Sequence, residues 1–191
     1  WKPEGNMLRL EGKVSSTAER ERCLRISYRM PLAAEGGTCG DDIGTQKGMM
    51  YSLPTWRRII HSRWSKLWAA VKEINPSGKV FYHSDGNIIK AVPELVEAGI
   101  DILNPLQPEC LDIDAIHREF GDRLTFDGTI GTQSTMPFGT PDDVRARVKE
   151  VIGKYGENGG LIISPTHVLE PDVPIANLEA FCEACREYGR G

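Results

Sequence analysis

Two of the four histidines follow short apolar runs, which is where functional groups sit in parallel βα folds. His83 closes the run 79–83, Asp85 comes two residues on, and His167 follows a later run at 160–164. The carboxyl ends of parallel strands are the usual place for ligand-binding groups. We therefore expect these three side chains to approach one another. Two imidazoles and one carboxylate suit zinc, and also a non-haem Fe(II) site.

Simpler interpretations exist for each residue taken alone. Asp85 can cap a helix that begins near Asn87, and a histidine at a strand end can be a hydrogen-bonded core residue. Their occurrence together at one predicted edge favours a functional site. Further polar residues are predicted at the same edge and are candidates for substrate or proton contacts: Asp41, Asp42, Asn104, Gln107, Asp127, Ser164 and Thr166.

Alternating strand and helix patterns supply the framework for these residues. Strands are predicted at 79–83, 100–103, 123–127 and 160–164, with helices at 88–96, 112–120, 140–155 and from about 174 onward. Upstream, 37–44 fits a further strand end and loop, followed by a long helix over 52–73. Such alternation predicts a parallel sheet covered by helices. Residues 1–37 have no clear period and stay unassigned, with partial disorder one explanation, whereas 38–191 form the predicted βα region.

Composition excludes several classes of protein. The chain has 191 residues, a net charge of -4 and a pI near 5.6. It lacks the basic field typical of nucleic-acid binding and any apolar run long enough to cross a membrane. Five irregularly spaced cysteines do not predict a secreted disulfide framework. With no signal-like N-terminus, a cytoplasmic location is the expectation.

Several motifs in the sequence resemble the uroporphyrinogen decarboxylase superfamily. They occur at 83–88, 99–108, 121–124, 139–141, 159–160 and 165–177, together with 41–46 and the helix from Ser52. The resemblance covers about residues 38–189. It implies an α/β (β/α)₈ TIM barrel, of which this chain supplies about the last five βα units as a partial barrel. The earlier units are not recognisable in residues 1–37, so a fragment or an altered early segment is expected.

The resemblance implies two chemistries. Uroporphyrinogen decarboxylation in porphyrin biosynthesis needs no cofactor, and the family's active-site histidine falls at His167. The family's Asp-Ser pair appears here as Asp41-Asp42, which puts Asp42 in a catalytic position. Corrinoid-linked zinc methyltransferases hold zinc through a His-x-Cys pair and a later Cys, and these positions correspond to His83, Asp85 and His167.

Metal-assisted methyl or small-group transfer of the cobalamin-linked type is the leading hypothesis. His83, Asp85 and His167 are the expected metal ligands, and Asn104, Gln107 and Asp127 the expected substrate contacts. Zinc is the expected metal ion ahead of iron, and no cofactor is expected if the chain is a decarboxylase. The expected partners are a small-molecule substrate and a corrinoid protein, and a homodimer stays open. Decarboxylation is the alternative, and a catalytically inactive fragment or binding module the second alternative.

Overall fold

The computed structural model describes residues 2–4, 7–10, 28–31, 36–156 and 159–189. Its centre is a five-stranded sheet in the order β10-β9-β8-β7-β4, and all four neighbouring pairs are parallel. The strands span Gly36–Gly40 (β4), Lys79–His83 (β7), Ile102–Asn104 (β8), Thr125–Asp127 (β9) and Leu161–Ile162 (β10). The predicted parallel α/β sheet is therefore confirmed for this part of the chain.

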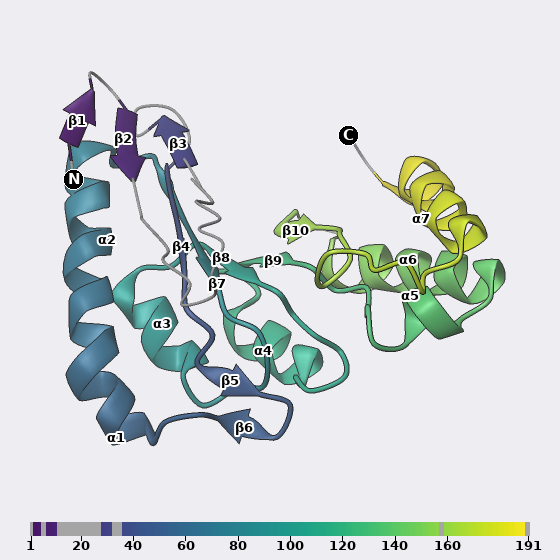
Figure 1. Cartoon of the computed structure of the whole chain (residues 1–191), viewed down its shortest axis with the longest axis horizontal. Coiled ribbons are helices and arrows are strands. Elements are labelled where there is room, and N and C mark those ends of the chain that lie inside the picture. Colours follow the sequence, from purple (N-terminus) through teal and green to yellow (C-terminus); the bar gives the residue numbers. More distant parts are fainter. Residues whose placement is uncertain (1, 5–6, 11–27, 32–35, 157–158, 190–191) are drawn as a thin grey trace, which may run out of the picture.

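Two small antiparallel sheets accompany the parallel one. Strands β1 (Lys2–Glu4), β2 (Met7–Leu10) and β3 (Tyr28–Pro31) pair within the segment that the sequence left unassigned. Most other residues of that segment lie outside the described ranges. Strands β5 (Gly44–Thr45) and β6 (Gly48–Met49) form a hairpin after β4. Figure 1 places this hairpin at the opposite end of β4 from the β1–β3 sheet.

The helices follow the strands as βα connections. Their bounds are Leu53–Trp56 (α1), Arg57–His61 (η1), Ser62–Ile74 (α2), Val92–Ala98 (α3), Ile113–Phe120 (α4), Thr135–Phe138 (α5), Pro141–Tyr155 (α6) and Ile175–Tyr188 (α7). In Figure 1, α2, α3 and α4 accompany the strands in the left and central part, and α6 and α7 pack together at the other end of the molecule.

Side chains alternate along the central strands. In β7, Val80 and Tyr82 are buried, whereas Phe81 and His83 are half-buried on the other face. Leu103, which lies beside Tyr82 in the register, and Phe126, which lies beside Leu103, are also buried. Trp64 and Trp68 of α2 stack on each other and meet Tyr82 edge-on. The apolar residues of β7, β8 and β9 and the tryptophan stripe of α2 thus share one core.

Local sequence signals explain where the helices begin. Thr140 caps α6 in a capping box with Asp143, at the start that was predicted for the helix over 140–155. The helical pattern over 88–96 was expected to break or restart at Pro93, and α3 does begin at Val92, because proline fits the first turn of a helix. The predicted helix over 52–73 contains a π-helical stretch, η1, between α1 and α2. The short helix α5 was not predicted.

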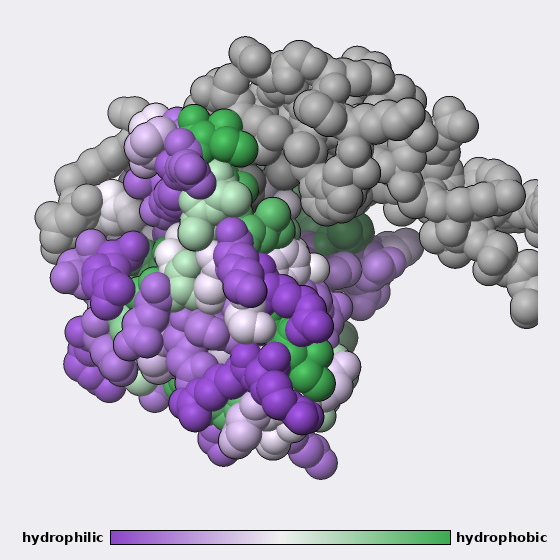
Figure 2. Space-filling model, turned by 90° about the vertical axis from the view of Figure 1, so that its left-hand side faces the viewer, coloured by the Kyte–Doolittle hydropathy of each residue, from purple (hydrophilic) through white to green (hydrophobic). Residues whose placement is uncertain are grey.

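The side of the molecule that carries α2 has a mixed surface. Hydrophilic residues predominate in Figure 2, and hydrophobic ones form separate patches. Ile59, Leu67 and Ile74 are exposed hydrophobic residues of this helical segment. Within the described ranges, no helix combines the length and apolar character that a membrane crossing requires.

Candidate metal centre

Three neighbouring strands bring His83 to the centre of the site. It is the last residue of β7, and the register sets it beside Gly40 of β4 and Asn104 of β8. Gly40 permits this close approach, because a Cβ there would lie 2.6 Å from the backbone oxygen of His83. Strand pairing alone therefore places the imidazole at the carboxyl edge of the sheet.

The loops after β4 and β7 are tied together beside His83. The backbone N–H of Ile43 donates to the Oγ of the buried Ser84 over 3.1 Å, and the N–H of Asp85 donates to Oδ1 of Asp42 over 3.0 Å. Gly86 follows with φ +84, and a Cβ there would lie 2.6 Å from the carbonyl carbon of Gly44. A glycine is therefore required where the two loops touch.

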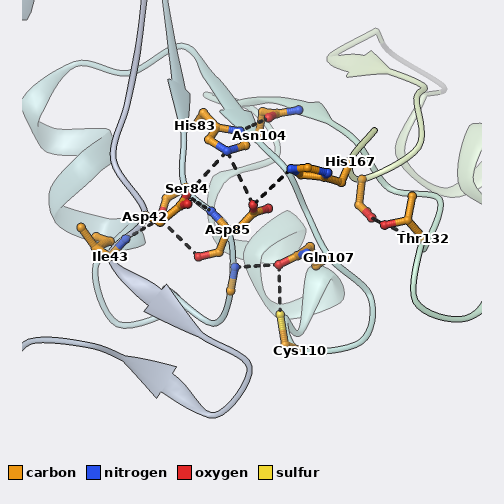
Figure 3. A network of polar contacts seen from close by, with 12 residues as sticks. Asp42, Ile43, His83, Ser84, Asp85, Asn104, Gln107, Cys110, Thr132 and His167 are labelled. Carbon is orange, nitrogen blue, oxygen red and sulfur yellow. Dashed lines mark hydrogen bonds and ion pairs between the residues drawn. The ribbon is translucent and has the colours of Figure 1, made fainter. Parts of the chain in front are cut away.

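Asp42, His83 and Asp85 form a cluster with the spacing of a metal site. One ligand atom from each lies within 4.8 Å of the other two. His83 Nε2 is 3.6 Å from Asp42 Oδ1 and 3.8 Å from Asp85 Oδ2. Figure 3 shows the three side chains converging, His83 from the end of β7 and the two aspartates from the loops after β4 and β7. We call this group the carboxylate–histidine cluster.

The polar contacts around the cluster fit a divalent cation. Asn104 Oδ1 lies 2.6 Å from His83 Nδ1 and accepts a hydrogen bond from it. The proton of the ring is therefore on Nδ1, and the lone pair of Nε2 faces the carboxylates. Asp85 Oδ1 is buried and has no hydrogen-bond partner in the described part of the chain. There, the ion-pair partners of Asp42 and Asp85 are histidines alone. Two carboxylates without a fixed cation suit a bound metal ion.

His167 approaches the cluster from the loop after β10. Its Nε2 lies 3.8 Å from Asp85 Oδ2, on the side of Asp85 away from Asp42 in Figure 3. His167 is not part of the carboxylate–histidine cluster, whose third member beside His83 and Asp85 is Asp42. Its side chain is half exposed. The structure thus brings His83, Asp85 and His167 to one edge of the sheet. Asp42, rather than His167, is the residue that joins His83 and Asp85 in the cluster.

The other predicted site residues lie around this group in distinct roles. Asn104 contacts the His83 ring, whereas Gln107 is buried and accepts the backbone N–H of Gly86 over 2.6 Å. Asp127 is also buried and accepts the Ser164 hydroxyl over 2.6 Å. Asp41 turns away from the cluster and accepts the indole N–H of Trp64. Burial, which here outweighs that hydrogen bond, raises the pKa of the Asp41 carboxyl.

A cleft of about 350 Å³ opens beside Asp85 and His167. Gln107, one of the expected substrate contacts, lines it. Three further lining residues were not selected as site residues, because they lie in irregular loops: Thr132, Glu170 and Asp172. Thr132 is held by a 2.9 Å contact between its hydroxyl and that of Thr166. Thr132 lies two residues after Ile130, which forms a parallel bridge with Pro165.

Comparisons with known proteins agree with this architecture. The family model for uroporphyrinogen decarboxylase (URO-D) matches residues 39–188. A uroporphyrinogen decarboxylase from Pseudomonas fluorescens is 28% identical over 93 residues, 49% of this chain and 25% of that protein. One from Methylococcus capsulatus is 24% identical over 94 residues, 49% and 26% of the two chains. One from Coxiella burnetii is 25% identical over 77 residues, and that match spans 21% of the relative's length.

A solved structure shares the fold. A methyltransferase from Methanosarcina mazei superposes with a TM-score of 0.63 at 18% identity, over 82% of this chain and 43% of that one. The match thus corresponds to part of a larger URO-D-type barrel. Because the family model covers well over half of the sequence, the chain belongs to the uroporphyrinogen decarboxylase family.

Proposed function

We propose that this chain carries the metal-binding half of an enzyme that transfers a methyl or similarly small group to a small-molecule acceptor. The observation that carries the proposal is the carboxylate–histidine cluster. Its three ligand atoms lie within 4.8 Å of one another, and no Lys or Arg side chain of the described residues neutralises its two carboxylates. Zinc is the preferred ion, because one imidazole and two carboxylates are within its usual ligand set.

Each residue has a separate task in this proposal. Bound zinc would lower the pKa of a thiol or hydroxyl acceptor, which makes that group nucleophilic near neutral pH. Asp42, His83 and Asp85 would hold the ion, and Asn104 fixes the ring of His83. His167 stands 3.8 Å from Asp85 at the open side, where it can take the proton that the acceptor releases. A corrinoid protein is the proposed methyl donor.

Uroporphyrinogen decarboxylation is the second candidate, favoured by the names of the curated relatives. It would use His167 without a metal. The cluster is a poor neighbour for a substrate that carries many carboxylates, because Asp42 and Asp85 add negative charge at the same edge. The two candidates therefore differ in their dependence on metal and in the charge of the substrate that they accept.

A demethylation assay tests the proposal. Zinc-loaded protein is mixed with methylcobalamin as the methyl donor and 2-mercaptoethanol as the acceptor, and the loss of the methylcobalamin absorbance is followed. We expect zinc-dependent turnover that Asp85→Asn abolishes and that Asp122→Asn, a change at an exposed aspartate away from the site, leaves intact. Metal-free turnover of uroporphyrinogen by the same protein, with no methyl transfer, would instead establish the decarboxylase.

A further inference from the structure

We propose that Gln107 is a positioning residue. It holds the loop segment 84–87 through the backbone N–H of Gly86, and so determines where the carboxylate of Asp85 meets the metal ion. The inference rests on the proposed function, because the place of this carboxylate matters only for a bound ion. It gives Gln107 a role other than the substrate contact that was expected from the sequence.

The segment 84–87 is held from two sides by consecutive backbone N–H groups. On the side of β8, the N–H of Ser84 donates to the backbone oxygen of Asn104 over 2.9 Å, and that of Gly86 donates to Oε1 of Gln107 over 2.6 Å. On the side of β4, the loop after that strand accepts the other two: Asp85 N–H to Asp42 Oδ1 over 3.0 Å and Asn87 N–H to Thr45 O over 2.7 Å. Two of these four acceptors are side-chain atoms, and one of the two belongs to the proposed ligand Asp42. Gln107 therefore supplies the side chain that can hold the segment without binding the ion.

Gln107 is itself fixed in place. Its side chain is only 4% exposed, and its backbone oxygen accepts the N–H groups of Cys110 and Leu111. The N–H of the preceding residue, Leu106, donates to the backbone oxygen of Asp127 at the end of β9. The thiol of Cys110 also donates to Oε1 of Gln107 over 3.6 Å (Figure 3). Two donors on one atom determine which end of the amide is the oxygen.

Loss of this acceptor would release the segment that carries Asp85. Gly86 is buried, and a buried backbone N–H without a partner is unfavourable. The segment cannot move toward the loop after β4, because Gly86 already packs against the backbone of Gly44. It would therefore move away from that loop, and the carboxylate of Asp85 would move with it. The 3.8 Å spacing between Asp85 and His83 thus depends on Gln107.

Direct contact with the substrate is the alternative role, since Gln107 lines the cleft beside Asp85. The two roles use opposite ends of the amide. The oxygen holds Gly86, whereas a substrate would meet the amide nitrogen. Gln107→Glu keeps an oxygen that accepts the N–H of Gly86 but has no amide nitrogen, and Gln107→Leu removes both. These two substitutions therefore separate the roles.

Zinc affinity, measured by competition with a chromophoric chelator, is the first test. Gln107→Leu should bind zinc about tenfold or more weakly than wild type, and so should Gln107→Asn, whose amide is too short to reach Gly86. Gln107→Glu should keep at least about a third of the wild-type affinity, because its carboxyl oxygen replaces the lost acceptor. Gln133→Leu is the matched control at an exposed glutamine of the same cleft, which makes no side-chain hydrogen bond within the described ranges. It should bind zinc as wild type does.

Two results of this titration would overturn the inference. One is wild-type affinity in folded Gln107→Leu or Gln107→Asn, since neither can hold Gly86. The other is an affinity in folded Gln107→Glu as low as in Gln107→Leu, which would show that the amide nitrogen, and not the acceptor oxygen, is required. Circular dichroism establishes that each variant is folded.

Hydrogen exchange in the metal-free protein tests the same contact without zinc. The amide of Gly86, followed by NMR, should exchange about tenfold faster in Gln107→Leu than in wild type. Exchange in Gln107→Glu should stay close to wild type, and the amide of Val148 within α6 is the folding reference. Unchanged exchange at Gly86 in Gln107→Leu overturns the inference. Faster exchange there, in a protein whose wild type binds no zinc, contradicts the metal proposal alone and keeps Gln107 as the residue that holds the segment.

Discussion

The Nδ1 atom of His83 lies 2.6 Å from the Oδ1 atom of Asn104, so the ring proton is held on the side away from the two carboxylates. Contacts of this kind orient a metal-binding imidazole and fix its tautomer. Asn104→Ala removes the acceptor, and we expect the zinc affinity to fall about 10- to 100-fold. Competition with a chromophoric chelator measures it. Asn104→Asp keeps an acceptor oxygen and should retain most of the affinity, whereas wild-type affinity in Asn104→Ala would contradict this role.

Gly86 sets the path of the loop that carries Asp85. Its φ of +84 disfavours an L side chain, and a Cβ would press on the backbone of Gly44 and Thr45. Gly86→Ala should therefore lower the free energy of unfolding by about 1–3 kcal/mol in urea titrations, and weaken zinc binding as the loop shifts. The matched control is Gly153→Ala within α6, where no neighbouring atom lies within 4 Å. That change should raise stability by up to about 1 kcal/mol.

Tyr82 has a buried hydroxyl without a hydrogen-bond partner in the described part of the chain. Tyr82→Phe removes an unsatisfied polar atom and keeps the ring against Trp68. We expect the free energy of unfolding to stay within about 0.5 kcal/mol of wild type or to increase. Tyr155→Phe is the contrast, because its hydroxyl donates to Asp114 over 2.6 Å; it should lose about 1 kcal/mol. A larger loss in Tyr82→Phe than in Tyr155→Phe would contradict this interpretation.

Cys39 makes stability depend on alkaline pH. Burial raises the pKa of its thiol from the usual 9.0 to about 11, despite the hydrogen bond from the Trp68 indole. The folded chain therefore holds this proton more tightly than the unfolded chain does. The thiol's contribution to stability is complete below pH 9 and is lost as the pH rises toward 11. Chemical denaturation across this range should show a smaller fall in stability for Cys39→Val than for wild type, and parallel curves would contradict the assignment.

The arrangement of the sheet was predictable because strand ends are visible in the sequence. The apolar runs at 79–83 and 123–127 end in polar residues, and a glycine follows each within three residues, so His83 and Asp127 could be placed at one edge. Parallel pairing then fixes which residues become neighbours, as His83 and Asn104 show. Helix bounds were less predictable where proline decides them, as at Val92 in α3.

The composition of the site was harder to predict than its position. Asp42 was selected from its place at the predicted sheet edge and from a family motif, yet its approach to His83 depends on the Ser84 hydroxyl and the N–H of Asp85, which tie the loops together. Glu170 and Asp172 lie in a loop without periodic pattern, so their place at the cleft depends on long-range packing. Asn177, for example, ties α7 to α5 by donating to the backbone oxygens of Met136 in that helix and of Gly139 directly after it.

The zinc content of the wild-type protein and of variants at Asp42, His83 and Asp85 tests the central claim most directly. The protein is incubated with zinc, dialysed and analysed by atomic emission, alongside Asp42→Asn, His83→Ala, Asp85→Asn and the surface control Asp122→Asn, with circular dichroism to establish folding. We predict about one tightly bound zinc per chain in wild type and in the control, and loss of that zinc in folded Asp85→Asn and His83→Ala. Zinc retained in both folded variants, or none bound by wild type, would contradict the account.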